Sequence, residues 1–115
     1  MNWYLSKLIF SIEPAEQGNK AQFDEQLRLV QSSNEADAYF KAKQIGKSIQ
    51  SEFENEEKEN VQWRFVDVSE VIEIKEIKDG MEVYSTTHET YEKENFINSV
   101  LQKGIAIQSR HLSFC

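Results

Sequence analysis

Apolar and polar residues alternate along two stretches at the start of the chain, which predicts a β-hairpin. The first stretch spans residues 2–13 and is apolar in both alternating sets, a pattern typical of a central strand or a strand at a dimer surface. The second spans residues 23–30, with Phe23, Leu27 and Leu29 in one phase. Residues 14–20 between them hold a proline and a Gly-Asn pair, which predict a loop.

A three- and four-residue spacing of apolar positions then predicts a long amphipathic helix. Ser32-Ser33-Asn34-Glu35 offers several N-cap donors, with Glu35 three residues beyond Ser32 as a capping box permits, and predicts that the helix starts here. Gly46 lies within the helix at a cost of about 1 kcal/mol relative to alanine, so it either permits close approach to the sheet or is a tolerated surface glycine. The charged residues 52–60 predict a frayed helix end and a solvated loop. The apolar positions are Ala38, Tyr39, Ala42, Ile45, Ile49 and Phe53.

The phase of the alternation changes within residues 61–78. Because a period of two cannot change face without an extra residue, we expect a β-bulge or strand break between Phe65 and Glu70. Asp79-Gly80 predicts a type I′ turn leading into a further strand over residues 81–88. The expected hairpin has a mostly polar face and an apolar face that meets the helix. The apolar face holds Ile72, Ile74, Met81 and Val83, and the polar face holds Lys75, Tyr84 and His88.

A second helix is expected after Thr90, with Phe96, Ile97, Val100 and Leu101 at helical spacing. Gly104 is a natural C-terminal cap, and residues 105–107 could add a short strand. The order is therefore ββαββα. The chain is predicted to be a single α+β domain over residues 1–115, in which an antiparallel sheet of two hairpins has the long amphipathic helix on one face, with a second helix at the C-terminus.

Composition narrows the function classes. The length of 115 residues and the 39% hydrophobic content fit one core. A net charge of -7 disfavours nucleic acid, because such binding relies on Lys and Arg. The chain has no signal peptide and no run of about 18 apolar residues, so no membrane association is expected. A lone cysteine, Cys115, gives no sign of an oxidising compartment, and a cytoplasmic location is predicted.

Candidate chemistry is sparse. His88, His111 and Cys115 lack the spacing of metal ligands, and the scattered glycines form no phosphate loop, so neither a metal nor another cofactor is expected. Glu25 shares the phase of the apolar residues in its strand. It is either a functional carboxylate paired with Lys7 or Arg64, or a structural ion pair or exposed strand end.

Four aromatic residues could form a recognition surface or belong to the core: Trp3, Tyr4, Trp63 and Tyr84. Trp3 and Trp63 are expected in the core, whereas Tyr84 has the phase of the polar face. The candidate partner-binding residues are Tyr84, Lys75, His88 and Tyr4.

Several short motifs resemble a family of small bacterial domains of unknown function. They are Asn2-Trp3-Tyr4-Leu5 with Lys7 and Phe10, then residues 23–27 (FDEQL), then Trp63-Arg64-Phe65 with residues 80–85 (GMEVYS). The resemblance covers about the first 90 residues and implies a small stand-alone domain of this architecture. It supplies no catalytic or binding residues.

The two-sided apolar first strand favours a non-enzymatic protein-interaction module, binding either a protein partner or a second copy as a homodimer. One alternative is an acidic inhibitor or immunity-type protein that neutralises a basic partner. Another is a small-molecule enzyme using Glu25 in a cleft between helix and sheet.

Overall fold

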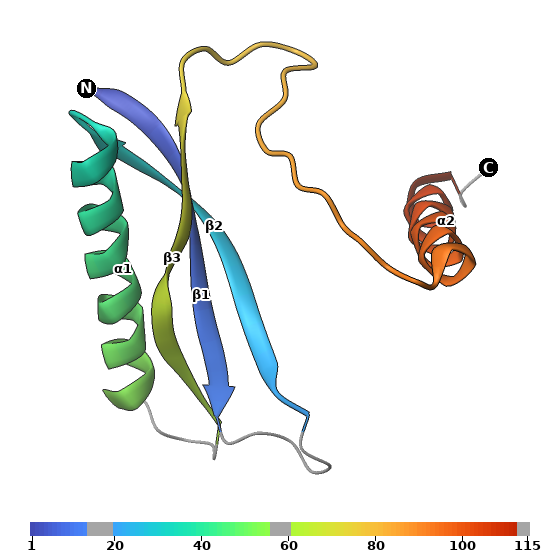
Figure 1. Cartoon of the computed structure of the whole chain (residues 1–115), viewed down its shortest axis with the longest axis horizontal. Coiled ribbons are helices and arrows are strands. Elements are labelled where there is room, and N and C mark those ends of the chain that lie inside the picture. The colour runs from blue at the N-terminus through green and yellow to red at the C-terminus, as the bar shows by residue number, and fades with distance from the viewer. Residues whose placement is uncertain (14–19, 56–60, 113–115) are drawn as a thin grey trace. The chain divides into compact units, whose positions relative to one another are not determined.

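The computed structural model describes residues 1–13, 20–55 and 61–112, and the chain forms two compact units, Met1–Tyr84 and Ser85–Cys115. Parts of three predictions lie outside the described residues. They are residues 14–19 of the predicted loop, residues 56–60 of the charged run and Cys115. Four elements build the first unit and one helix the second (Figure 1). The elements are β1 (Asn2–Glu13), β2 (Gln22–Ser32), α1 (Glu35–Asn55), β3 (Gln62–Ile74) and α2 (Lys93–Leu112).

The three strands form one antiparallel sheet in the order β2-β1-β3, so the doubly apolar first strand is central, as its pattern predicts. Tyr4 pairs with Val30, which places the even residues of β1 and β2 on the face that α1 covers. The odd residues of β2, which include Phe23, therefore lie on the other face of the sheet. This odd set is more apolar than the even set that faces α1.

Helix α1 packs closely on the sheet because small residues recur at every turn of one stripe. Ala38, Ala42 and Gly46 are all buried, and a β carbon on Gly46 would lie 2.3 Å from the ring of Phe65. Close approach is thus the role of this glycine. Asn34 caps the helix, accepting the Asp37 amide at 2.8 Å, so the helix starts within the predicted residues 32–35. The buried core comprises Tyr4, Leu8, Phe10, Val30, Ala38, Ala42 and Val68.

The predicted irregularity between Phe65 and Glu70 is confirmed. The register of β3 against β1 shifts twice, once between Phe65 and Asp67 and once between Val68 and Glu70. Because two bulges restore the original phase, Val71 packs against the core, whereas Ile72 pairs beside Leu5 on the face opposite α1. The prediction that Ile72 and Ile74 meet the helix is therefore wrong.

The turn at Asp79-Gly80 is formed, but the strand expected after it is not. Gly80 has φ 82°, and the Met81 amide donates to the Lys78 carbonyl at 3.2 Å. Residues 75–92, all described, contain no strand, so the sheet has three strands where the sequence predicts four. A hairpin with few apolar side chains to bury is marginal in water, which explains why the turn alone persists.

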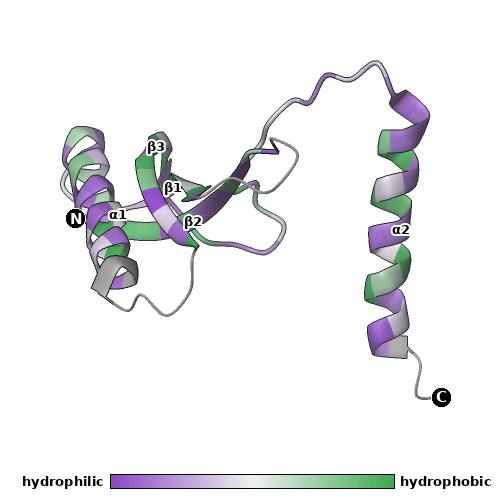
Figure 2. Ribbon diagram, turned by 90° about the horizontal axis from the view of Figure 1, so that it is seen from below, coloured by the Kyte–Doolittle hydropathy of each residue, from purple (hydrophilic) through white to green (hydrophobic). Residues whose placement is uncertain are grey.

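Helix α2 continues through Gly104 to Leu112, so the predicted helix end at Gly104 and the short strand at 105–107 are wrong. The apolar spacing continues into Ile105, and one glycine costs about 1 kcal/mol without ending a helix. Figure 2 shows apolar positions recurring along α2. Neither described helix is long and apolar enough to cross a membrane. The exposed apolar residues of α2 are Phe96, Ile97, Val100, Leu101, Ile105 and Ile107.

Candidate functional site

The sheet face opposite α1, here called the open face, carries apolar residues from all three strands of the first unit. Leu29, Leu5 and Ile72 lie side by side across the three strands and form an entirely apolar row. Leu29 is 57% exposed and Trp3, next to the row, is 46% exposed, whereas Leu5 in the middle of the row is 8% exposed and Ile72 is half-buried. Such grouping is unlike the scattered single apolar residues of an ordinary surface, and it marks this face as a candidate binding surface. The open face comprises Trp3, Leu5, Lys7, Ile9, Phe23, Glu25, Leu27, Leu29, Glu70, Ile72 and Ile74.

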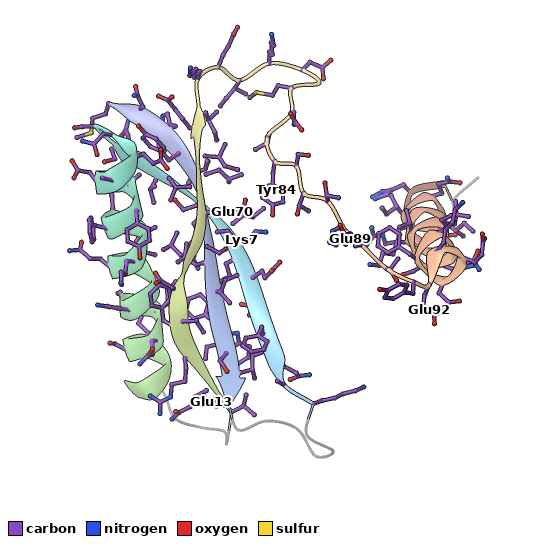
Figure 3. All side chains as sticks on the ribbon, in the orientation of Figure 1. Lys7, Glu13, Glu70, Tyr84, Glu89 and Glu92 are labelled. Atoms are coloured by element: carbon purple, nitrogen blue, oxygen red, sulfur yellow. The ribbon has the colours of Figure 1, made fainter. Side chains whose placement is uncertain are left out.

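Beside the apolar row, Tyr84 joins two charged residues of neighbouring strands. Lys7 and Glu70 are register partners, and the Lys7 Nζ donates a hydrogen bond to the Tyr84 hydroxyl. That hydroxyl donates to Glu70 Oε1 at 3.3 Å, while the ammonium lies 4.2 Å from the centre of the tyrosine ring. Figure 3 shows these three side chains gathered at the sheet. The segment after β3 is thereby attached to the open face.

The electrostatics of Lys7 follow from this attachment. The hydrogen bond to Tyr84 raises the pKa of the Lys7 ammonium above its usual 10.5, with smaller contributions from Glu25 and Glu70, while desolvation opposes the shift. Lys7 is thus held charged and positioned. Lys7, Glu70 and Tyr84 form a structural clamp, because their side chains bond to one another and join β1, β3 and the segment after β3.

A second candidate surface is a groove of about 580 Å³ between the first turns of α1 and the middle of β3. Phe40, on its rim, is 59% exposed and meets the ring of Tyr39 edge to face at 5.2 Å between ring centres. Its volume is within the range of small-ligand and side-chain pockets. The lining residues are Glu35, Ala36, Tyr39, Phe40, Val68, Ser69, Glu70 and Val71.

Asp67 fixes the wall of this groove at the bulged part of β3. Its Oδ1 accepts the Tyr39 hydroxyl at 2.8 Å and the Val68 amide at 2.7 Å. The Val68 amide first and the Tyr39 hydroxyl second lower the pKa of the Asp67 carboxyl below its usual 3.8. The carboxylate therefore ties α1 to β3 where the strand ladder is irregular.

The four predicted partner-binding residues are divided between the two units. Tyr4 is 4% exposed beneath α1, and Lys75 is exposed just after the end of β3. His88 belongs to the second unit, where its ring lies 5.8 Å from that of Phe96. Among the three candidates of the first unit, Tyr84 is the one that contacts side chains of the open face, Lys7 and Glu70.

Glu25 is exposed, so the hypothesis of a buried functional carboxylate is wrong. Its strand phase is that of the open face, and Lys7 engages Tyr84 while Arg64 lies 3.6 Å from Glu13. No group of three or more potential metal-ligating side chains occurs in the described part of the chain.

The two tryptophans differ in placement. Trp63 is partly buried against the core, as predicted, and its indole donates to Asp24 at 3.2 Å. Trp3 is on the open face, which contradicts its expected core position. Its neighbours in the register are Gln31 and Ile74, so it borders the apolar row from the end of the sheet.

Sequence reasoning missed Glu70 and the groove. The sequence offers Lys7 as a partner for Glu25 and gives no indication of its contact with Tyr84. A periodic pattern gives no sign of a contact between residues 77 positions apart, such as that between Lys7 and Tyr84. The signal that could have found Glu70 is the strand register, which places its carboxylate beside Lys7.

Comparisons with known proteins give a family and no activity. A search of curated proteins found no match, and a search of solved structures found none either. The family described as Domain of unknown function (DUF4288) matches residues 3–85. The match ends one residue after Tyr84, so it covers the sheet, α1 and the clamp but not α2. The chain belongs to this family of domains of unknown function.

Proposed function

We propose that the protein is a self-associating interaction module, in which α2 of one copy covers the open face of a second copy. The observation that carries this proposal is the apolar row Leu29, Leu5 and Ile72 with exposed Trp3 at its border. A sheet is stable in water when each apolar face is covered by another layer, and α1 covers one face only.

Helix α2 has an apolar stripe that no other element of its own unit covers among the described residues. Its apolar stripe, including Val100 and Leu101, is exposed, and a helix of 20 residues without tertiary packing is marginally stable in water. Helix α2 is roughly 30 Å long and the strands of the sheet are roughly 40 Å long, so the helix fits within the length of the open face. Taken by itself, each unit therefore carries an apolar surface that no other element of the same unit covers among the described residues.

Charge supports the same pairing. The charged residues of α2 are Lys93, Lys103 and Arg110 against Glu94, so this helix is basic in a chain of net charge -7. A basic helix is attracted to an acidic domain. In a two-fold symmetric dimer each copy would give its helix and receive that of its partner, which doubles the buried area.

Sedimentation analysis of the full chain across concentration tests the proposal. We expect a monomer–dimer equilibrium, and Leu29→Glu should weaken it by at least about tenfold, because a carboxylate would be desolvated in the interface. Ile77→Glu is the matched control, since Ile77 is 82% exposed and lies after the end of β3. A chain that stays monomeric at every concentration contradicts the proposal.

A further inference from the structure

The groove between α1 and β3 adjoins a sheet edge. In the order β2-β1-β3, strand β3 is an outer strand, and among the described residues it pairs with β1 alone. An outer strand presents a row of backbone amides and carbonyls that a further strand can pair with. The edge and the groove are adjacent because Val68 to Val71 belong to both.

We infer that this edge is a binding site for an extended, basic segment of another protein, which adds as a fourth strand to β3 and inserts an apolar side chain into the groove. Strand addition beside a helix is an established mode of peptide recognition, in which backbone hydrogen bonds give affinity and pockets for alternate side chains give specificity. This site shares residues of β3, including Glu70, with the open face, but it lies at the outer edge of the strand and not on the sheet face. The inference therefore does not depend on self-association.

The geometry of β3 favours one stretch of the edge. Between Glu70 and Ile74 the register with β1 is regular, because both bulges precede it. The bulge at Ser69 ends this regular stretch at the groove, where Val71 is half-buried and Val68 is buried. In a segment paired to residues 70–74, the residue beside Glu70 would thus place its side chain in the groove.

The groove has a fixed apolar wall. The hydrogen bond from Tyr39 to Asp67 and the bond from the Val68 amide to the same carboxylate hold α1 and β3 together at this point. Preorganised walls reduce the entropy that binding costs. Phe40 supplies an exposed aromatic surface at the rim, a residue type enriched at protein interfaces.

Charge complementarity indicates the chemistry of the partner. The charged residues that line the groove are Glu35 and Glu70, both acidic, and Glu73 lies further along the same edge. A segment that alternates apolar residues with lysine or arginine would place its cations beside these carboxylates. An acidic segment would be repelled, so the site prefers segments with a positive net charge.

The probe is a short fluorescent peptide of alternating lysine and valine, titrated with the full chain and followed by anisotropy and by amide NMR shifts. We expect saturable binding with the largest shifts at the amides of residues 68–74. The same peptide with N-methyl groups on alternate amides should bind at least about tenfold more weakly, because it cannot donate to the edge. A glutamate–valine peptide should not bind.

Two variants separate the groove from general charge attraction. Ala36→Arg fills the groove and should weaken binding by at least about tenfold, whereas Ser48→Arg adds the same charge on an exposed position of α1 outside it and should leave binding close to wild type. Circular dichroism checks that both variants fold.

Three results would overturn the inference: no binding of the lysine–valine peptide, equal effects of the two arginine variants, or amide shifts confined to β1 and β2. Leu29→Glu tests self-association independently, because Leu29 does not line the groove. Peptide binding that survives this change, together with loss of the dimer, shows that the two surfaces act separately.

Discussion

A β carbon on Gly46 would lie 2.3 Å from Cε1 of Phe65, so this glycine sets the distance between α1 and β3. Gly46→Ala should lower the free energy of unfolding by about 1–2 kcal/mol, since overpacking outweighs the gain in helix propensity. Chemical denaturation measures the change. Gly104→Ala in α2 is the control, because nothing lies within 4 Å of its added β carbon, and it should not destabilise the chain. Equal effects of the two changes would contradict the close-packing role.

Ser6 is fully buried under α1, and its Oγ has no hydrogen-bond partner among the described residues. Ser6→Ala removes a desolvated hydroxyl with little change in volume, so the free energy of unfolding should rise by roughly 1 kcal/mol. Ser11→Ala, at a half-buried position of the same strand, should be close to neutral. A clear loss of stability in Ser6→Ala would show that the hydroxyl is bonded after all.

Asp67 should make stability depend on acid pH. Its folded pKa is lowered below 3.8, so its contribution is present above pH 3.8 and is lost as the pH falls through the folded pKa. At neutral pH, Asp67→Asn should cost roughly 1–2 kcal/mol through weaker hydrogen bonds to Tyr39 and Val68. The difference from wild type should shrink at the lowest pH that the fold tolerates. A difference that does not change with pH would contradict the role of the carboxylate.

Lys7 should show the opposite dependence. Its folded pKa is raised above 10.5, so the stabilisation is present below pH 10.5 and is lost as the pH rises through the folded pKa. Tyr84→Phe removes the main cause of the shift, and the Lys7 pKa should then move back towards 10.5, as measured by NMR of the lysine side chain. An unchanged Lys7 pKa in this variant would show that Tyr84 does not engage the ammonium.

The sequence predicts the central position of β1, the helix α1 and the bulged region of β3, because each depends on local periodicity. It does not predict which face of β2 α1 covers. The phase of Phe23 and Leu27 is the more apolar, yet the phase of Val30 packs on the helix, since small residues such as Ala42 let α1 approach there. Tertiary packing overrides the pattern of a single strand.

The sequence predicts neither the second bulge, at Ser69, nor the clamp formed by Lys7, Glu70 and Tyr84. Ser69 and Glu70 carry no apolar signal that would mark a second change of phase, so Ile72 and Ile74 were assigned to the wrong face. The contact between Lys7 and Tyr84 depends on how the segment after β3 returns to the sheet. Neither feature follows from spacing along the chain, and both define the open face.

Mixing two dimerisation-defective variants tests the exchange of α2 between copies most directly. Leu29→Glu damages the open face and leaves α2 intact, whereas Leu101→Glu damages α2 and leaves the face intact. Each variant alone should sediment as a monomer, and the mixture should form a dimer through its one intact helix–face contact, with an affinity between those of the variants and the wild type. A mixture that stays monomeric while the wild type dimerises, or a wild type that never dimerises, would contradict the proposed exchange.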